Sequence, residues 1–274
     1  MASTYELVIQ PRKGWRSIDF GELWAYRELL GFMIWRDIKV RYKQTALGGL
    51  WAILQPLVGM VVFGVLFQRV AAIPSDGSPY PLFVFTGLVL WTFFSNGLTL
   101  SSNSLVACEN MIRKIYFPRI LVPLGQVLAL LLDLLIGLAC LAGLMLYYRW
   151  PVSLKLLWVP FFVLGSCLVT AGFGFMLSSL YVRFRDVKYA VPFFTQMLLF
   201  LTPVLYPMDH VPGNLRFLLS ANPMAGMVEG FRYAFLGGPL SWGLVAISFA
   251  EAVASFAVGI FFLRRMETTF ADVI

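Results

Sequence analysis

The sequence predicts an all-α integral membrane protein with six transmembrane helices. Of its 274 residues, 59% are hydrophobic and only 13% are charged, whereas soluble domains carry about a quarter charged residues. A helix needs about 20 apolar residues to cross the hydrocarbon core with its backbone hydrogen bonds made internally. Charge-poor runs of that length recur along the whole chain, and each is a candidate span.

The charge-poor runs define one transmembrane domain, residues 47–263. Its predicted spans are residues 47–68, 81–107, 120–148, 156–182, 189–208 and 240–263. A cytoplasmic segment, residues 1–46, precedes the domain, and a cytoplasmic tail, residues 264–274, follows it. The domain is therefore expected to cross the membrane an even number of times.

The distribution of Lys and Arg predicts the orientation, because cytoplasmic loops retain positive charge. With the N-terminus inside, 16 of the 21 cations fall in cytoplasmic segments. The five that fall outside are Arg69, Arg149, Lys155, Arg216 and Arg232. We therefore expect both termini to be cytoplasmic in an inner (cytoplasmic) membrane. Contact with anionic membrane lipids accounts for the net charge of +7 without a nucleic-acid partner.

The segment before the first span, "FGELWAYRELLGFMIWRDIKVRYK" (residues 20–43), mixes Trp and Tyr with basic residues. This composition is typical of a membrane–water interface. It predicts an interfacial helix on the inner leaflet, or a helix that contacts a partner. The apolar side chains do not gather on a single helical stripe, so a loose basic arm is the alternative.

The segment between the fifth and sixth spans is interrupted by Pro207, Pro212, Pro223 and Pro239. Its uncharged piece, residues 217–228, is too short to cross the membrane. Short re-entrant or surface helices fit that length, since irregular backbone at depth is tolerated only where it is buried or lines a cavity. We interpret this segment as a gate at the outer face.

Signals for enzymatic chemistry are missing from the sequence. No GxxxxGK[S/T] motif is present to hold ATP phosphates. The lone His210 and the three cysteines have no metal-ligand spacing, and no nucleophile has an evident base partner. The sequence therefore predicts no catalytic residue, no metal site and no cofactor in this chain.

Two acidic residues, Asp133 and Glu251, lie within predicted spans. An ionisable side chain at that depth is costly and is by default a functional candidate. Either residue could hydrogen-bond within the helix bundle, contact a polar substrate, or relay protons. The spans contain no Lys or Arg that could pair with them.

Four stretches in order resemble a known family. They are "RDIKVRYKQTALGGLWAILQPL" (36–57), "ENMIRKIYFPRILVPL" (109–124), "RFRDVKYAVPFFTQMLLFLTPVLYP" (183–207) and "NPMAGMVEGFRYAFLGG" (222–238). Together with the six-span layout, they resemble the membrane-spanning permease subunits of ATP-driven polysaccharide exporters, of the O-antigen, capsule or teichoic acid type. These subunits are a group within the type-2 ABC permeases.

The resemblance implies partners and contact residues. Two such chains would form a homodimer, and each would bind a separate ATP-binding subunit that holds ATP and magnesium. The cargo would be a lipid-linked polysaccharide. The residues expected to contact the ATPase are Trp35, Arg36, Arg41, Arg113, Lys114, Tyr116, Phe117 and Arg119.

A sugar polymer needs a wide conduit, and aromatic side chains suit pyranose rings. The candidate channel-lining residues are Trp51, Phe63, Phe67, Trp91, Phe93, Phe94 and Asp133. The candidate outer-gate residues are Tyr206, Asn222, Pro223, Glu229 and Arg232. Spacing alone does not separate lining aromatics from lipid-facing ones.

Two alternatives remain open at this point. The nearest is an ABC permease for a small amphiphile or drug, which keeps the same architecture. The other is a proton-coupled secondary transporter that works without an ATPase. Only Asp133 and Glu251 support it.

Overall fold

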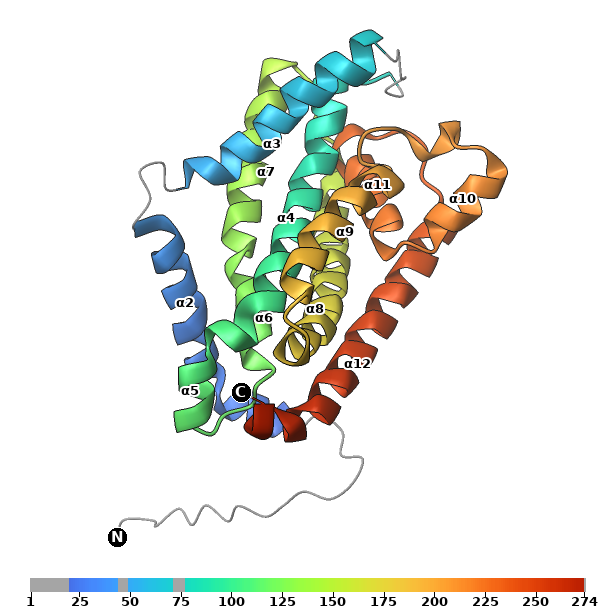
Figure 1. Ribbon diagram of the computed structural model, residues 1–274. Coiled ribbons are helices and arrows are strands. Elements are labelled where there is room, and N and C mark those ends of the chain that lie inside the picture. The colour runs from blue at the N-terminus through green and yellow to red at the C-terminus, as the bar shows by residue number, and fades with distance from the viewer. Residues whose placement is uncertain (1–19, 44–48, 71–76, 274) are drawn as a thin grey trace.

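The computed structural model describes residues 20–43, 49–70 and 77–273, and all regular secondary structure within these ranges is helical (Figure 1). Residues 1–19 of the predicted cytoplasmic segment lie outside the described residues. The long helices form a bundle in which Leu50–Phe63 and Trp242–Val273 lie obliquely to the others. The all-α prediction is therefore confirmed.

Five helical stretches are long and apolar enough to cross a membrane, and each overlaps one predicted span. They are Leu50–Phe67 (α3, Leu50–Phe63, continued by η1, Gly64–Val70), Tyr80–Ala107 (α4), Leu121–Tyr147 (α6, Leu121–Ala129, and α7, Leu131–Tyr147), Leu154–Arg183 (η2, Leu154–Trp158, and α8, Val159–Arg183) and Trp242–Glu267 (within α12, Trp242–Val273). The chain is a multi-pass membrane protein.

The fifth predicted span, residues 189–208, is helical over only part of its length. Helix α9 (Val187–Leu201) has 15 residues, fewer than the roughly 20 that a span requires. The helix ends where Thr202 adopts an extended backbone conformation, and the following residues turn away from the helix axis before η3 (Met208–His210).

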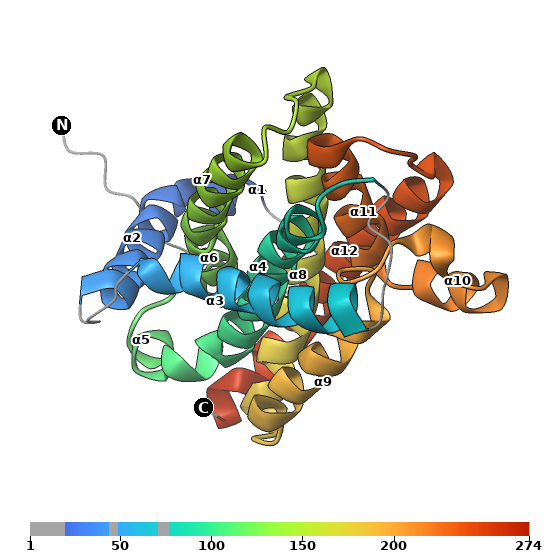
Figure 2. The same cartoon turned by 90° about the horizontal axis from the view of Figure 1, so that it is seen from above.

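Helix α4 forms the centre of the bundle. It lies against α3, α6, α7, α8, α9 and α11, and 78% of its most apolar stretch is buried inside the chain. By contrast, only 11% of the corresponding stretch of α3 is buried. Figure 2 shows α3 crossing one side of the bundle. Most of the surface of α3 is therefore left for lipid or for a partner.

Helices α8 and α12 pack with their backbones in direct contact. A Cβ atom added to Gly259 would lie 2.2 Å from the carbonyl oxygen of Gly172, and one added to Gly172 would lie 2.5 Å from the backbone of Ser255. Small residues allow such close approach between helices in membranes, where dispersion contacts replace the hydrophobic effect as the driving force. The two glycines thus set the spacing of this helix pair.

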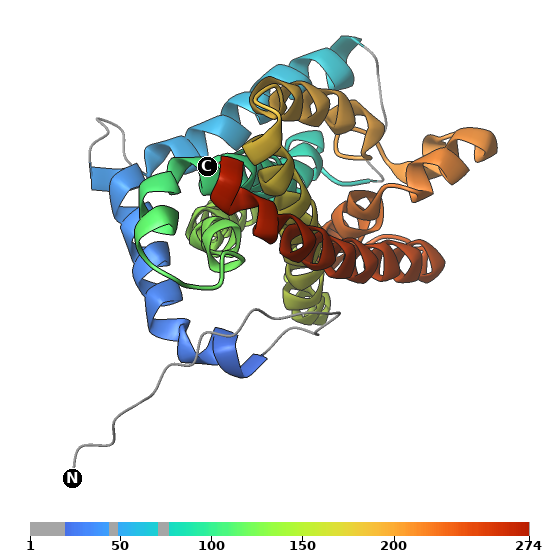
Figure 3. The same ribbon diagram turned by 60° about the horizontal axis from the view of Figure 1, so that its bottom comes forward.

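Both described ends of the chain lie at the same end of the bundle (Figures 1 and 3). Helices α1 (Phe20–Ala25), α2 (Arg27–Lys43) and α5 (Glu109–Lys114) are found there with the end of α12. Helix α2 packs along α6, where Met33 is buried and meets Gly125.

Two short helices, α10 (Gly213–Ser220) and α11 (Pro223–Leu236), occupy the segment between α9 and α12. Helix α11 begins with Pro223 in its first turn, and the side-chain oxygen of Asn222 accepts a hydrogen bond from the Met224 amide at 3.0 Å. Asn is a favoured N-cap and Pro a favoured first residue of helices. Most of α11 is buried against α4, α8 and α12.

Candidate functional site

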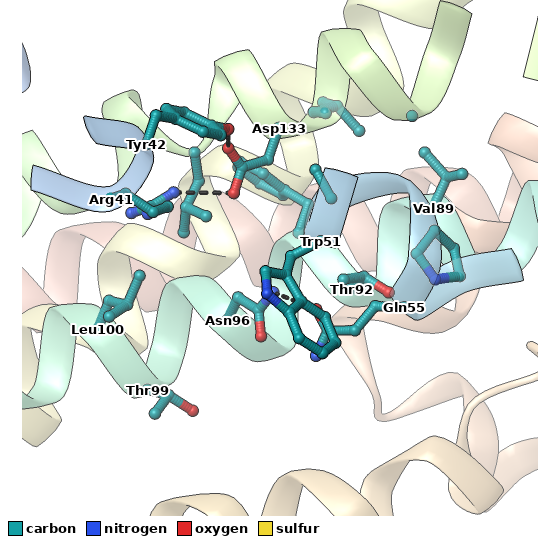
Figure 4. A pocket seen from close by; sticks show the side chains of 16 residues that line it. Arg41, Tyr42, Trp51, Gln55, Val89, Thr92, Asn96, Thr99, Leu100 and Asp133 are labelled. Carbon is teal, nitrogen blue, oxygen red and sulfur yellow. Dashed lines mark hydrogen bonds and ion pairs between the residues drawn. The ribbon is translucent and has the colours of Figure 1, made fainter. Parts of the chain in front are cut away.

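A cavity of about 290 Å³ lies beside the first membrane span, between α3, α4, α7 and the end of α2 (Figure 4). Its wall is mostly apolar, and we call it the polar cavity after the polar side chains that border it. Its polar lining residues are Arg41, Tyr42, Gln55, Thr92, Asn96, Thr99 and Asp133. Trp51 and Phe93 add aromatic surface to its walls. The cavity is thus built from three predicted spans and from the helix that precedes them.

The carboxylate of Asp133 is paired with two residues of α2. Arg41 Nη1 donates a hydrogen bond to Asp133 Oδ2 at 2.8 Å, and the Tyr42 hydroxyl donates to Asp133 Oδ1. Burial, together with the hydrogen bond and charge of Asp133, raises the pKa of the Tyr42 hydroxyl, so Tyr42 stays a proton donor. No Lys or Arg lies within the predicted spans. The cation that pairs with Asp133 is Arg41 of α2, the helix that precedes the first span.

A second polar contact lies on the same face of α2. The Gln126 side-chain amide donates to Asp37 Oδ2, and Arg36 forms an ion pair with Asp37 at 2.8 Å. Phe32 and Trp35 are exposed elsewhere on α2. The buried face of α2 carries both polar and apolar side chains, and other apolar side chains of the helix are exposed. Its sequence therefore shows no single apolar stripe.

Amide side chains of α3 and α4 meet on the cavity wall. Asn96 Nδ2 donates to Gln55 Oε1 at 3.3 Å. Among the described residues, the amide nitrogen of Gln55, the amide oxygen of Asn96 and the hydroxyl of Thr92 have no further hydrogen-bond partner. These groups lie within candidate membrane spans. Gln55 is exposed and Thr92 and Asn96 are partly exposed, so their hydrogen-bonding atoms are open to a ligand in the cavity.

The structure brings together three of the seven candidate channel-lining residues, since Trp51, Phe93 and Asp133 all border the cavity. The others lie elsewhere. Phe63 and Phe67 form a ring pair with centroids 6.0 Å apart on α3 and η1. Trp91 and Phe94 are buried side chains of α4 with centroids 5.2 Å apart.

Arg232, one of the candidate outer-gate residues, is a buried cation that holds the chain just after α9. Its Nη2 donates to the carbonyl oxygens of Pro203 and Val204 at 2.8 and 3.0 Å, and its Nη1 donates to Glu229 Oε1 at 3.1 Å. The guanidinium carbon lies 3.7 Å from the centroid of the Phe83 ring. Arg232 thus satisfies two carbonyl groups of the non-helical turn that follows α9.

The remaining outer-gate candidates are tied to the same stretch of chain. Glu229 Oε1 accepts from the Met208 amide at 3.1 Å, and Asn222 Nδ2 donates to Thr202 Oγ1 at 2.8 Å. Tyr206 donates its hydroxyl proton to the Phe200 carbonyl at 2.9 Å. Together with Pro223, these residues anchor the broken segment to α9 and α11.

The expected ATPase-contact residues on α5 and in the loop after it lie at the end of the bundle that carries α1, α2 and α5, whereas Arg41 borders the polar cavity and pairs with Asp133. Arg113 pairs with Glu109 at 2.7 Å, and Lys114 lies beside it on α5. In the loop that follows, Ile115 and Tyr116 are exposed, whereas Phe117 is buried. A partner could reach Tyr116 directly but not the Phe117 ring.

Arg119 connects the same loop to α12. Its Nη1 donates to the Glu267 carbonyl oxygen at 2.7 Å, and its Nε lies 3.7 Å from Glu267 Oε1. At the other end of α12, Ser248 Oγ accepts a hydrogen bond from the Gly226 amide of α11 at 3.1 Å. Helix α12 therefore contacts both the loop and the broken segment.

Sequence reasoning missed Tyr42, Gln55 and Asn96 as members of the cavity. Gln55 is the one strongly polar side chain in the apolar stretch Leu50–Phe67, which was a usable signal. Asn96 falls in the polar extension "SNGLTLSSNS" of the second span, where many residues share its character. Tyr42 had no comparable signal, because its role depends on the packing of α2 against α7.

Comparisons with known proteins agree with this architecture. The O-antigen export system permease protein RfbA of Klebsiella pneumoniae is 29% identical over 248 residues, covering 90% of this chain and 95% of the relative. Its namesake from Myxococcus xanthus is 30% identical over 253 residues, with the same two coverages. The polysialic acid transport protein KpsM of Escherichia coli is 28% identical over 219 residues, covering 76% of this chain and 81% of the relative.

A family model decides the classification. The model described as ABC-2 type transporter matches residues 28–236. The matched region runs from α2 through α11 and includes every residue that lines the polar cavity. The chain therefore belongs to the ABC-2 type transporter family.

Proposed function

We propose that this chain is the channel-forming permease subunit of an ABC transporter that exports a lipid-linked polysaccharide, such as O-antigen, across the cytoplasmic membrane. The observation that carries the proposal is the similarity to export permeases over nine tenths of the chain. The chain itself is a transporter subunit and not an enzyme, and ATP and magnesium are held by a separate subunit.

The topology proposed is six passes with both termini in the cytoplasm. Two observations support it: α1 and the end of α12 lie at the same end of the bundle, and the helices found there, α2, α5 and the end of α12, carry several Lys and Arg residues. Helix α9, extended by the turn that Arg232 holds, completes the fifth pass. Helices α10 and α11 then form an outer re-entrant gate.

A second copy of this chain is proposed to complete the conduit. Helix α3 is the least buried of the candidate spans, and both α3 and α9 expose rows of large apolar side chains. These include Trp51, Val58 and Val62 on α3, and Phe193, Phe194 and Phe200 on α9. A homodimer would bring such faces around a path wide enough for a sugar chain.

The ATP-binding subunit is proposed to dock on the cytoplasmic end of the bundle. Trp35 on α2 and Ile115 and Tyr116 after α5 are exposed there, beside the cations Lys39 and Lys114. Exposed aromatic residues are enriched in protein interfaces. Because α2 is bound to Gln126 and Asp133, a force on α2 would reach the third span.

Transport by the reconstituted complex tests the proposed function. The permease and its ATP-binding subunit, purified together into proteoliposomes, are expected to move a lipid-linked glycan only when ATP is hydrolysed. Glycan transport driven by a proton gradient without the ATPase would overturn the proposal and favour coupling through Asp133 or Glu251. Hydrolysis stimulated by drugs but not by lipid-linked glycan would instead identify a drug permease.

Replacing Tyr116 by Ala is expected to weaken binding of the ATP-binding subunit by tenfold or more. The Tyr116 ring is exposed in the loop that follows α5, and exposed Tyr residues are frequent hot spots of interfaces. The measurement is the fraction of ATPase retained when the tagged permease is purified. Tyr147→Ala is the matched control, because Tyr147 is also exposed but lies at the opposite end of the bundle. Equal retention by both variants would exclude this docking site.

A further inference from the structure

We infer that the polar cavity between α3, α4 and α7 is a binding site for one pyranose unit of the transported glycan. The inference rests on the proposed function, since it takes the cargo to be a polysaccharide. The site is the cavity lined by Trp51, Gln55, Thr92, Asn96 and the Arg41–Asp133 pair.

The leftover hydrogen-bonding groups of the cavity match a sugar. Gln55 offers an amide donor and Asn96 an amide acceptor, while Thr92 offers a hydroxyl that does both. Sugar hydroxyl groups also donate and accept, so a single ring can satisfy all three residues at once. An apolar ligand or a lipid tail would leave these groups unpaired inside the membrane, which is costly.

The charge of the cavity favours a neutral ligand. Its one cation, Arg41, is already bound to the one carboxylate, Asp133, at 2.8 Å. An anion such as a phosphate would have to compete with Asp133 for the guanidinium, and its own charge would be repelled by that carboxylate. A neutral polyhydroxyl group meets neither obstacle.

The size and shape of the cavity fit a single ring. Its volume of about 290 Å³ lies at the lower end of the range of about 300–1,000 Å³ that small-molecule pockets show. Trp51 is half-exposed at the wall, as Figure 4 shows beside Gln55 and Asn96. Its indole face can pack against the C–H face of a pyranose while the amides bind the hydroxyl groups.

Binding of n-octyl β-D-glucoside to the permease–ATPase complex in lipid nanodiscs tests this site. We expect saturable binding below the micellar concentration, weakened tenfold or more by Gln55→Met and by Asn96→Leu. Asn103→Leu is the matched control, because Asn103 lies on the same helix but donates its amide to the Thr99 carbonyl at 2.7 Å. It is expected to bind like the unmodified protein, and all variants should retain their thermal stability and ATPase binding.

Two further probes distinguish binding of the sugar ring from binding of the alkyl tail and from binding of an anionic head group. Tetraethylene glycol monooctyl ether has the same tail without a sugar ring, and octyl phosphate has an anionic head. Equal binding of the ether, tighter binding of the phosphate, or unchanged glucoside binding in Gln55→Met and Asn96→Leu would each overturn the inference.

Glycan transport by the same variants distinguishes failure of the site from failure of the proposed function. If the two variants transport lipid-linked glycan with unchanged KM, the sugar site is wrong and the polysaccharide exporter stands. If the glucoside occupies the cavity but the unmodified complex transports no glycan, the proposed function is wrong. A raised KM for glycan in the two variants, with the KM of Asn103→Leu unchanged, is the result expected if both are right.

Discussion

Arg232→Leu is expected to destabilise the folded protein by about 3–5 kcal/mol, since it breaks a buried ion pair and removes the cation paired with Glu229. The guanidinium also binds the Pro203 and Val204 carbonyl groups and stacks on Phe83, so all of these partners lose a contact at once. The measurement is the fraction of protein that stays monodisperse in mild detergent as the temperature rises.

Arg216→Leu is the matched control for this experiment. Arg216 lies in the same outer segment, but its ion pair with Asp209 is 3.7 Å long and largely exposed. Exposed ion pairs contribute little to stability, so the melting temperature of Arg216→Leu should stay close to that of the unmodified protein. Arg232→Lys should not restore stability, because an ammonium group lacks the planar fork that serves two carbonyl groups and a carboxylate. Equal melting of Arg232→Leu and Arg216→Leu would contradict the role assigned to Arg232.

Gly259→Leu is expected to prevent the close packing of α8 and α12. Even a single Cβ at this position would lie 2.2 Å from the Gly172 carbonyl oxygen, and backbone cannot rotate away as a side chain can. Overpacking of this kind costs about 1–3 kcal/mol and occasionally more, and a Leu side chain adds three further carbon atoms. The same thermal assay should show a large loss of folded protein, together with loss of transport.

Gly143→Leu provides the comparison for Gly259→Leu. Gly143 lies on α7, and a Cβ added there would meet nothing within 4 Å. The substitution should be neutral, or slightly stabilising because Gly is a poor helix former. If both glycine variants melted alike, the close contact of α8 and α12 would not determine stability.

The positions of the long helices could be predicted from composition because the physical requirement is simple. A span must be apolar and about 20 residues long, and five charge-poor runs meet that requirement as single or kinked helices. The run 189–208 is also uncharged, but its helix stops at Leu201, so a fifth pass over this run stays a prediction. The carbonyl groups beyond that point are satisfied by Arg232, 29 residues after Pro203. Composition carries no sign of such a distant partner.

The candidate cavity was predictable only in part, for a related reason. Asp133 stood out because an acidic residue is rare in a span, and Trp51 and Phe93 were named among the lining aromatics. Which aromatic residues face the cavity depends on how each helix is rotated, and nearly every residue type in these helices is apolar. Arg41 meets Asp133 because α2 packs along α6, a contact that no local pattern announces.

Helix α12 gives the molecule a mechanical connection between its two ends. It is bound to Arg119 near its end through Glu267 and to the first turn of α11 through Ser248, and roughly 28 Å of continuous helix separates these two contacts. Between these two contacts, Ser255 and Gly259 of α12 lie against the backbone of α8 at Gly172. Because α12 packs along α8 over much of its length, a displacement of its Glu267 end would be carried by the helix pair to the first turn of α11.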